Sequence, residues 1–296
     1  MSTLYFTGNA LDWAALLLCA AAGFAVCGRA GLFNLGLEGQ IYTGGFTASA
    51  VMLALSRCGT PPFFVLAAGL TGAALSAGIL GAVSGLLKKH CGASELISSF
   101  LLSAFVSAII DYLIAGPLRG TAESLLAMEK LPRALLLARI LPPSSLNPSV
   151  FAAAALVVLC WLFLMRTPRG YRLRLAGTAP EFARFGGIDA RAFWTGSMAF
   201  SGACAGLAGF FAVAGTDGIC HQGFPSGLGW AAITTGMIAR SKPLLLFPAA
   251  VFYAALKHGS NVLLLTAGGG GAAFNIVSGL ALFAATAHIR PGRPRH

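Results

Sequence analysis

Residues 10–28 read ALDWAALLLCAAAGFAVCG, an apolar run whose only charged side chain is Asp12. An α-helix crosses a bilayer core about 30 Å thick with roughly 20 apolar residues. Of the chain's 296 residues, 57% are hydrophobic and only 10% are charged. Soluble globular chains carry about 25% charged residues. The composition therefore indicates an integral membrane protein and excludes a soluble globular fold.

Similar apolar runs recur along the whole chain. We expect about nine transmembrane helices, at residues 10–28, 34–56, 62–87, 94–115, 149–165, 192–214, 226–240, 243–265 and 272–289. The fifth and seventh runs are short, so these segments are expected to be tilted differently or partly re-entrant. The predicted fold is all-α, a polytopic integral membrane protein with a single transmembrane domain over residues 1–296.

The distribution of basic residues predicts how the chain is oriented in the membrane. A formal net charge of +11 is compatible with nucleic-acid binding, but these residues cluster at Lys88-Lys89 and within 166–191, 240–242 and 290–295. Cytoplasmic loops of membrane proteins carry an excess of Lys and Arg. Nine spans with the N-terminus outside put all four clusters and the C-terminus in the cytoplasm. The long loop 116–148 is then external. Because the basic residues are explained by this orientation, we expect the chain to contact the lipid bilayer and not nucleic acid.

A polar interruption separates the first two apolar runs. Residues 31–40 read GLFNLGLEGQ, with Asn34, Glu38 and Gln40 as the polar side chains. Glycine weakens a helix, and non-helical backbone inside a membrane is tolerated only where protein or a water-filled cavity satisfies it. We therefore predict a discontinuous helix near 31–40, beside a translocation path. The alternative is a tight cytoplasmic turn in which Glu38 is solvated.

Four further polar residues fall inside late apolar runs. They are Lys257, His258, Asn261 and Asn275. Ionisable residues within membrane helices usually face the interior of the bundle or a cavity, so we predict that these residues, with Asn34, Glu38 and Gln40, line a substrate pathway. For Lys257 the alternative is a side chain that extends to the membrane interface.

The basic stretch 166–191 contains a short segment with helix signals. Its residues of interest are Thr178, Glu181, Phe182, Arg184, Phe185 and Gly187. Thr178 and Glu181 have the spacing of a capping box, and the glycines at 186 and 187 would end the helix. The two phenylalanines would then project into the cytoplasm, an arrangement that favours docking to a partner. The alternative is an amphipathic segment on the membrane surface.

Glycine pairs mark expected helix contacts. Gly81 with Gly85, and Gly202 with Gly206, have the G-x-x-x-G spacing that lets membrane helices approach closely. The seven cysteines form no C-x-x-C pair and no metal-ligand spacing with histidine. Cys58 and Cys220 both fall in predicted external segments, where a disulfide between them is one alternative.

The sequence also resembles a known family. Residues 33–40, FNLGLEGQ, resemble the F-N-[IL]-G-x-E-G-Q signature of permeases of bacterial ATP-binding cassette (ABC) importers of the nucleoside and simple-sugar type. These permeases belong to the larger family that includes ribose and branched-chain amino acid permeases. Residues 172–177 are similar to the main cytoplasmic loop of that family, and residues 227–233 to one of its late segments.

The resemblance implies an importer subunit that works by alternating access. It implies a pore made with a sister permease as a heterodimer, a cytoplasmic ABC ATPase that docks on the coupling segment 178–187, and an external substrate-binding lipoprotein or periplasmic protein. ATP and Mg are expected on the ATPase, and this chain is expected to bind no cofactor and no metal. The expected location is the bacterial cytoplasmic membrane. Purine nucleosides are the favoured cargo, with simple sugars and branched-chain amino acids as alternatives.

Other classes of function are less compatible with the residues. The sequence has no G-x-x-x-x-G-K-[ST] phosphate loop and no Ser/His/Asp or Cys/His arrangement for catalysis, so we expect no enzyme. An ion-coupled secondary transporter, using Glu38 and Asp111, is the alternative. The segment 178–187 separates the two, because a secondary transporter needs no docking site for an ATPase.

Overall fold

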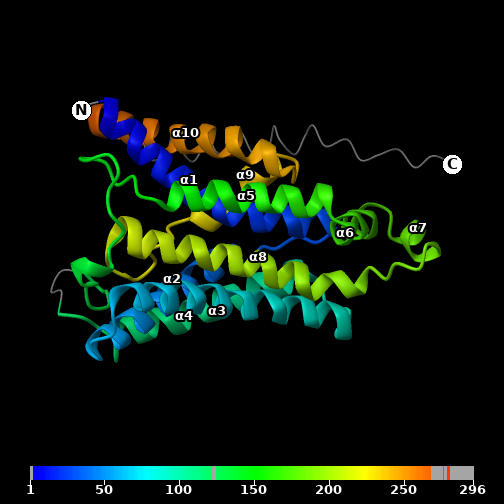
Figure 1. The fold of residues 1–296 in the computed structure, drawn as a ribbon, viewed down its shortest axis with the longest axis horizontal. Coiled ribbons are helices and arrows are strands. Elements are labelled where there is room, and N and C mark those ends of the chain that lie inside the picture. Colours follow the sequence, from blue (N-terminus) through cyan, green and yellow to red (C-terminus); the bar gives the residue numbers. More distant parts are fainter. Residues whose placement is uncertain (1–2, 122–124, 268–275, 277–278, 281–296) are drawn as a thin grey trace.

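A computed structural model describes residues 3–121, 125–267, 276, 279 and 280 (Figure 1). The described part is helical and contains no named β-strand. The helices are α1 (Thr3–Arg29), α2 (Leu37–Arg57), α3 (Pro62–Cys91), α4 (Glu95–Ala115), α5 (Ser149–Arg166), α6 (Pro168–Thr178), α7 (Pro180–Phe185), α8 (Arg191–Phe211), α9 (Leu228–Ile238) and α10 (Leu246–Ala267). A π-helical turn, η2 (Ala212–Asp217), extends α8, and 3₁₀ turns occupy Arg133–Leu135 and Pro243–Leu245.

The all-helical membrane fold predicted from the sequence is confirmed. Five helical segments are long and apolar enough to cross a membrane: Leu4–Arg29, Pro62–Cys91, Glu95–Ala115, Ser149–Arg166 and Arg191–Asp217. A helix covers most of each of the first eight predicted runs, and α1 and α3 extend beyond theirs. The ninth run, 272–289, falls outside the described residues apart from 276, 279 and 280. At 1.5 Å per residue, α9 is only about 16 Å long, too short to cross a bilayer core.

Burial separates the helices into a centre and a periphery. The apolar window of α1 is 83% buried and that of α8 with its π-helical extension is 72% buried, whereas that of α4 is only 22% buried. The large exposed side chains of α4 and α5 are aliphatic or aromatic, apart from Met165 and the charged Arg166 at the end of α5. Lipid can cover such a surface at no cost in hydration, so α1 and α8 form the core and α4 and α5 lie at the lipid-facing edge.

Glycines bring α3 and α8 together, as the G-x-x-x-G spacing predicted. A Cβ added to Gly202 would clash with the Ala77 carbonyl oxygen, and one added to Gly206 with the Ala73 carbonyl oxygen. From the other side, Gly81 faces the Met198 carbonyl. The two backbones therefore touch directly, which maximises van der Waals contact where no hydrophobic effect drives association.

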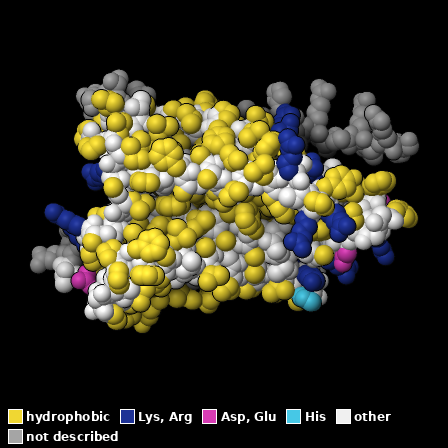
Figure 2. Space-filling model, in the orientation of Figure 1, with side chains coloured by type: hydrophobic (Ala, Val, Ile, Leu, Met, Phe, Trp, Pro, Cys, Tyr) yellow, Lys and Arg dark blue, Asp and Glu magenta, His cyan; other side chains and the backbone are white. Residues whose placement is uncertain are grey.

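The basic clusters within the described residues lie at one end of the bundle. Lys88 Nζ forms a 2.6 Å salt bridge with Glu95 and lies 5.0 Å from the ring centroid of Trp194, close to the start of α8. Arg29 Nε donates a 2.8 Å hydrogen bond to the Ser241 carbonyl, which joins the ends of α1 and α9. Figure 2 shows Lys and Arg gathered at the end that carries α6 and α7. The shared end predicted for 88–93, 166–191 and 240–242 is thus observed.

The described residues of the loop 116–148, which are 116–121 and 125–148, pack at the opposite end. Their backbone pairs with the segment after α8: Met128 N–H donates to the Cys220 carbonyl at 2.9 Å and Leu131 N–H to the Gly218 carbonyl at 3.0 Å. Arg57, at the end of α2, forms a 2.6 Å salt bridge with Glu129. The described residues of the loop therefore cover the end of the bundle that is remote from α6 and α7.

Candidate pathway and docking segment

The interruption between α1 and α2 lies inside the helix bundle. Residues 30–36 are not helical, and α2 begins at Leu37. Two serines of α4 satisfy the backbone here: Leu35 N–H donates to Ser99 Oγ at 3.1 Å, and Gly39 N–H to Ser103 Oγ at 2.7 Å. Ser99 is four residues into α4, about 6 Å from its start. The broken backbone thus meets protein partners, as a discontinuous helix requires.

Asn34 and Gln40 hold the shape of this interruption. Asn34 Nδ2 donates to Gln40 Oε1 at 2.8 Å and to Ser201 Oγ of α8 at 3.0 Å. Asn34 Oδ1 accepts from the Gly36 amide at 2.9 Å. Asn34 is 0% exposed and Gln40 is 1% exposed. In this conformation their polar atoms are occupied by the protein, so contact with a cargo stays a prediction for both residues.

Glu38 joins α2 to the start of α9. Its Oε1 accepts a 2.7 Å hydrogen bond from the Gly227 amide and its Oε2 a 2.6 Å bond from the Gly229 amide. Gly227 has φ of +85°, a left-handed conformation that suits glycine. Free amides and the helix dipole make a helix N-terminus an anion site. The half-buried carboxylate therefore anchors α9 and is not simply solvated in a cytoplasmic turn.

The ionisable residues of α10 lie against α1. Lys257 Nζ is 3.8 Å from the ring centroid of Trp13, and that ring stacks on Tyr253 at 6.0 Å. Nε2 of His258 is buried without a hydrogen-bond partner among the described residues. Asn261 belongs to the same helix, and Asn275 lies outside the described residues. Lys257 is also near enough to Glu38 for an electrostatic interaction, which connects this group to the α9 anchor.

Two exposed aromatic side chains flank the same anchor. Trp230, directly after Gly229, is 47% exposed, and Phe100 of α4 is 45% exposed. Their ring centroids are 6.3 Å apart. Trp230 falls in the stretch 227–233 that resembles a family segment, but hydropathy does not distinguish an exposed aromatic residue from a core one. Together with Glu38 they form a surface that offers aromatic rings and a carboxylate.

Asp12 is a second buried carboxylate that the sequence marked only as an isolated charge. It is 2% exposed. Its oxygens accept hydrogen bonds from Asn147 Nδ2 at 2.7 Å and from Ser145 Oγ and Thr216 Oγ1 at 2.9 Å. Thr216 lies in the π-helical turn η2. Asp12 therefore links α1 to the loop 116–148 and to the π-helical turn, so it belongs to a polar network and is not an isolated charge.

The predicted coupling segment forms a helix of its own, α7, beyond the end of the bundle (Figure 1). Phe182 is 66% exposed and Phe185 is 93% exposed, as predicted. Gly187 has φ of +73° and follows the last turn, which confirms the predicted stop. Glu181 and Arg184 are exposed on the same segment and line a groove of about 450 Å³ with Trp194.

The predicted capping box is wrong. Thr178 is the last residue of α6, and the N-cap of α7 is Ala179, without a side-chain hydrogen bond. The physical reason is that Thr167 and Pro168 start a helix earlier than expected. Thr167 Oγ1 accepts a 3.0 Å bond from the Gly170 amide, and α6 then continues through Thr178. Thr178 is thus in a helical turn and unable to act as a cap.

The end of α6 touches the interruption directly. A Cβ added to Gly177 would clash with the Arg29 carbonyl oxygen, and one added to Gly31 would lie 2.9 Å from the Gly177 carbonyl oxygen. The backbone turn at residues 29–31 therefore packs on the helix that leads into α7. This contact connects the projecting segment to the residues that precede Glu38.

Comparisons with known proteins agree with this architecture. The family described as branched-chain amino acid transport system / permease component matches residues 6–286. The chain is 38% identical over 257 residues to the probable riboflavin import permease protein RfuC of Treponema pallidum, covering 86% of this chain and 67% of the relative. It is 27% identical to the glucose ABC transporter permease protein TsgB13 of Haloferax volcanii, covering 79% and 63%.

A further relative carries a nucleoside name. The chain is 25% identical to the guanosine ABC transporter permease protein NupP of Bacillus subtilis, covering 87% of this chain and 74% of the relative. No solved structure matches the chain. Because the family match runs through almost all the described helices, the chain belongs to the permease components of ABC importers, of the nucleoside and simple-sugar type.

Proposed function

We propose that the chain forms half of the membrane pore of an ATP-driven importer that works by alternating access. The observation that carries this proposal is α7, which projects beyond the basic end of the bundle with Phe182 and Phe185 exposed. Burying an aromatic side chain of this size is worth about 1.5–3 kcal/mol. A helix that displays two of them is suited to a groove on a partner, and the partner proposed is the cytoplasmic ABC ATPase, which carries ATP and Mg.

The other partners follow from the same orientation. With the basic end in the cytoplasm, the N-terminus lies outside, and the loop 116–148 faces the substrate-binding lipoprotein or periplasmic protein. A sister permease supplies the second half of the pore, and the complex lies in the bacterial cytoplasmic membrane.

Direct contacts connect α7, through α6, to the interrupted segment inside the bundle. The end of α6 rests on the turn at 29–31 through Gly177. Three residues after that turn Asn34, and then Glu38, hold the interruption in place. We propose that a shift of α6 moves this turn and, through Glu38, the amino end of α9. The two interrupted segments would then open and close one side of the path.

The cargo proposed is a nitrogen heterocycle that bears a ribosyl or ribityl chain. Purine nucleosides and riboflavin share this chemistry, and permeases named for riboflavin and guanosine are among the relatives. The exposed rings of Trp230 and Phe100 offer a stacking surface for the heterocycle. Lys257 and His258 offer polar groups for the hydroxyl-bearing chain. Glucose has no aromatic ring for π-stacking on these side chains, so it is the weaker candidate.

The double variant Phe182→Ala with Phe185→Ala tests the coupling. Neither residue lies in a membrane-spanning helix, so normal membrane abundance is expected, with loss of ATPase co-purification and of ATP-dependent uptake. Phe151→Ala is the matched control, because Phe151 is 69% exposed on α5 and lies away from α7. Uptake should be measured in proteoliposomes with labelled guanosine, riboflavin, glucose and leucine.

The same assay decides between the classes of transporter. Uptake that continues without any ATPase and follows a proton or sodium gradient would replace the importer proposal with an ion-coupled secondary transporter. Uptake of glucose or leucine alone, with ATP required, would leave the importer in place and overturn the proposed cargo.

A further inference from the structure

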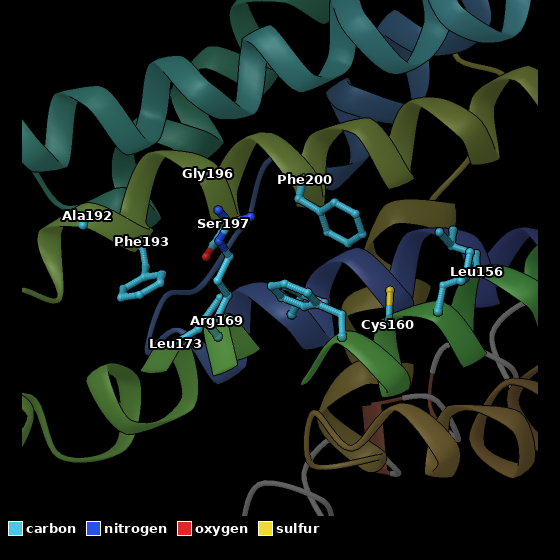
Figure 3. A pocket seen from close by; sticks show the side chains of 12 residues that line it. Leu156, Cys160, Arg169, Leu173, Ala192, Phe193, Gly196, Ser197 and Phe200 are labelled. Carbon is cyan, nitrogen blue, oxygen red and sulfur yellow. The ribbon is translucent and has the colours of Figure 1, made fainter. Parts of the chain in front are cut away.

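A cavity lies between the core and the lipid-facing edge of the bundle, where α1, α5, α6 and α8 meet (Figure 3). Its volume is about 480 Å³. Its lining is mostly aliphatic and aromatic, with Leu156, Phe163, Leu173, Phe193 and Phe200 among the residues involved. A site of this size is within the range of small-molecule pockets, roughly 300–1,000 Å³.

Two polar side chains stand at one part of this wall. Arg169 extends from α6 toward Ser197 of α8 (Figure 3). Ser197 is only 4% exposed, and its Oγ has no hydrogen-bond partner among the described residues. An unpaired hydroxyl in an apolar setting is costly. Arg169 and the Ser197 hydroxyl could bind an anionic head group, and the apolar part of the cavity could hold an apolar tail.

The cavity is open toward the surface where lipid lies. Leu159 is 61% exposed and Phe200 is 39% exposed, and both line it. Figure 2 shows a hydrophobic surface over α5 and α8 on this face. A Cβ added to Gly196, another lining residue, would meet nothing within 4 Å. A molecule can therefore enter from the bilayer without displacing backbone.

We propose that this cavity binds an anionic phospholipid, with its phosphate at Arg169 and Ser197 and an acyl chain along Phe163, Leu156 and Phe200. Basic pockets between membrane helices bind anionic head groups. The charge of Arg169 selects an anionic over a zwitterionic head. The cargo of the importer fits this cavity poorly, because its hydroxyl groups would face an aliphatic wall with two polar side chains.

Two substitutions in the full chain test the site. Arg169→Ala removes the charge, and Gly196→Leu fills the cavity from a position with open space. Arg172→Ala is the matched control for charge, since it lies on the same helix but outside the lining. Ala155→Leu is the matched control for bulk, being exposed on α5 and outside the lining. Retained lipids are counted by native mass spectrometry after exchange into phosphatidylglycerol or phosphatidylcholine.

The chain itself should retain one phosphatidylglycerol in preference to phosphatidylcholine and gain thermal stability when phosphatidylglycerol is added. Arg169→Ala should weaken this binding by about tenfold, as expected for a lost charge-assisted hydrogen bond. Gly196→Leu should abolish it, and both controls should bind normally. Inorganic phosphate should give no thermal shift, because it has no acyl chain.

Four results would overturn the proposal. Equal retention of the two lipids would show that the charge selects nothing. A melting-temperature shift with inorganic phosphate equal to that with phosphatidylglycerol would indicate a simple anion site. Binding that survives in Gly196→Leu, or that is absent from the assembled complex because another permease chain covers α5 and α8, would show that the cavity serves a different occupant. Normal folding of Gly196→Leu is checked by its elution as a monodisperse species.

Discussion

Glu38 and Gly229, 191 residues apart in the chain, are joined by a 2.6 Å hydrogen bond from the Gly229 amide to the Glu38 carboxylate. The other carboxylate oxygen holds the Gly227 amide. Glu38 lies in the first turn of α2, so one negative charge serves the amino ends of two helices at once. If either the segment before α2 or the segment before α9 moves, the other must move with it or these hydrogen bonds must break.

Glu38→Ala is therefore expected to have both a structural and a functional effect. Hydrogen bonds to a charged group are worth about 1.5–3 kcal/mol, so the variant should melt at a lower temperature and lose uptake. Glu38→Gln keeps one acceptor oxygen but turns an amide NH₂ toward a backbone N–H, and it should be intermediate in both measurements. An unchanged melting temperature in Glu38→Ala would show that the link to α9 does not stabilise the fold.

Gly177→Ala tests the contact between α6 and the turn at 29–31. The added Cβ clashes with the Arg29 carbonyl oxygen, so α6 must shift away from the turn. We expect the ATPase to co-purify normally, because α7 is intact, while ATP-driven uptake falls by at least about tenfold. Gly186→Ala is the control, since a Cβ there meets only carbonyl oxygens at 3.4 Å and beyond. Normal uptake by Gly177→Ala would mean that this contact transmits nothing.

Two native cysteines report the orientation. Cys58 follows α2 and Cys91 ends α3; both are free and exposed, and the other five thiols are buried and free. The considered disulfide between Cys58 and Cys220 is therefore absent. The 30 residues of α3 separate the two ends. A membrane-impermeant maleimide should label Cys58 in intact cells, or in spheroplasts where an outer membrane intervenes, and Cys91 only after permeabilisation. Cys58→Ser and Cys91→Ser assign the signals, and the reverse pattern would invert the topology.

Trp230→Ala tests the aromatic surface beside Glu38. If the heterocycle stacks on this ring, the apparent KM for guanosine or riboflavin should rise by about fivefold to tenfold, as expected for about 1–1.5 kcal/mol of lost stacking. Trp230→Phe should restore most of the affinity. Phe63→Ala, which truncates a side chain 76% exposed at the start of α3, serves as the control. Unchanged KM values in Trp230→Ala would place the cargo elsewhere.

Reasoning from the amino-acid sequence alone was sufficient to predict the class of protein, a helix in each of the first eight apolar runs, the glycine contacts between α3 and α8, and the shared end of the described basic clusters. It also identified the aromatic pair of α7. These features depend on hydropathy, charge and residue size, which are properties of short segments. They act through contact with the bilayer or with an adjacent helix. The wrong capping box at Thr178 also has a local cause. A helix begins at Thr167 and Pro168 and continues as α6 through Thr178, so Thr178 is not available as an N-cap.

The contacts of the polar residues, by contrast, could be known only from the three-dimensional packing of the helices. The sequence around Asn34 and Gln40 would be the same whether these side chains faced a cargo or Ser201. In the folded chain they are 0% and 1% exposed, and Asn34 donates a hydrogen bond to Ser201 of α8. Glu38 could pair with any donor at its depth, and the choice of Gly227 and Gly229 depends on where the turn before α9 returns. A carboxylate shows in the sequence that it needs a partner, but the partner is set by the folding of distant segments into one bundle.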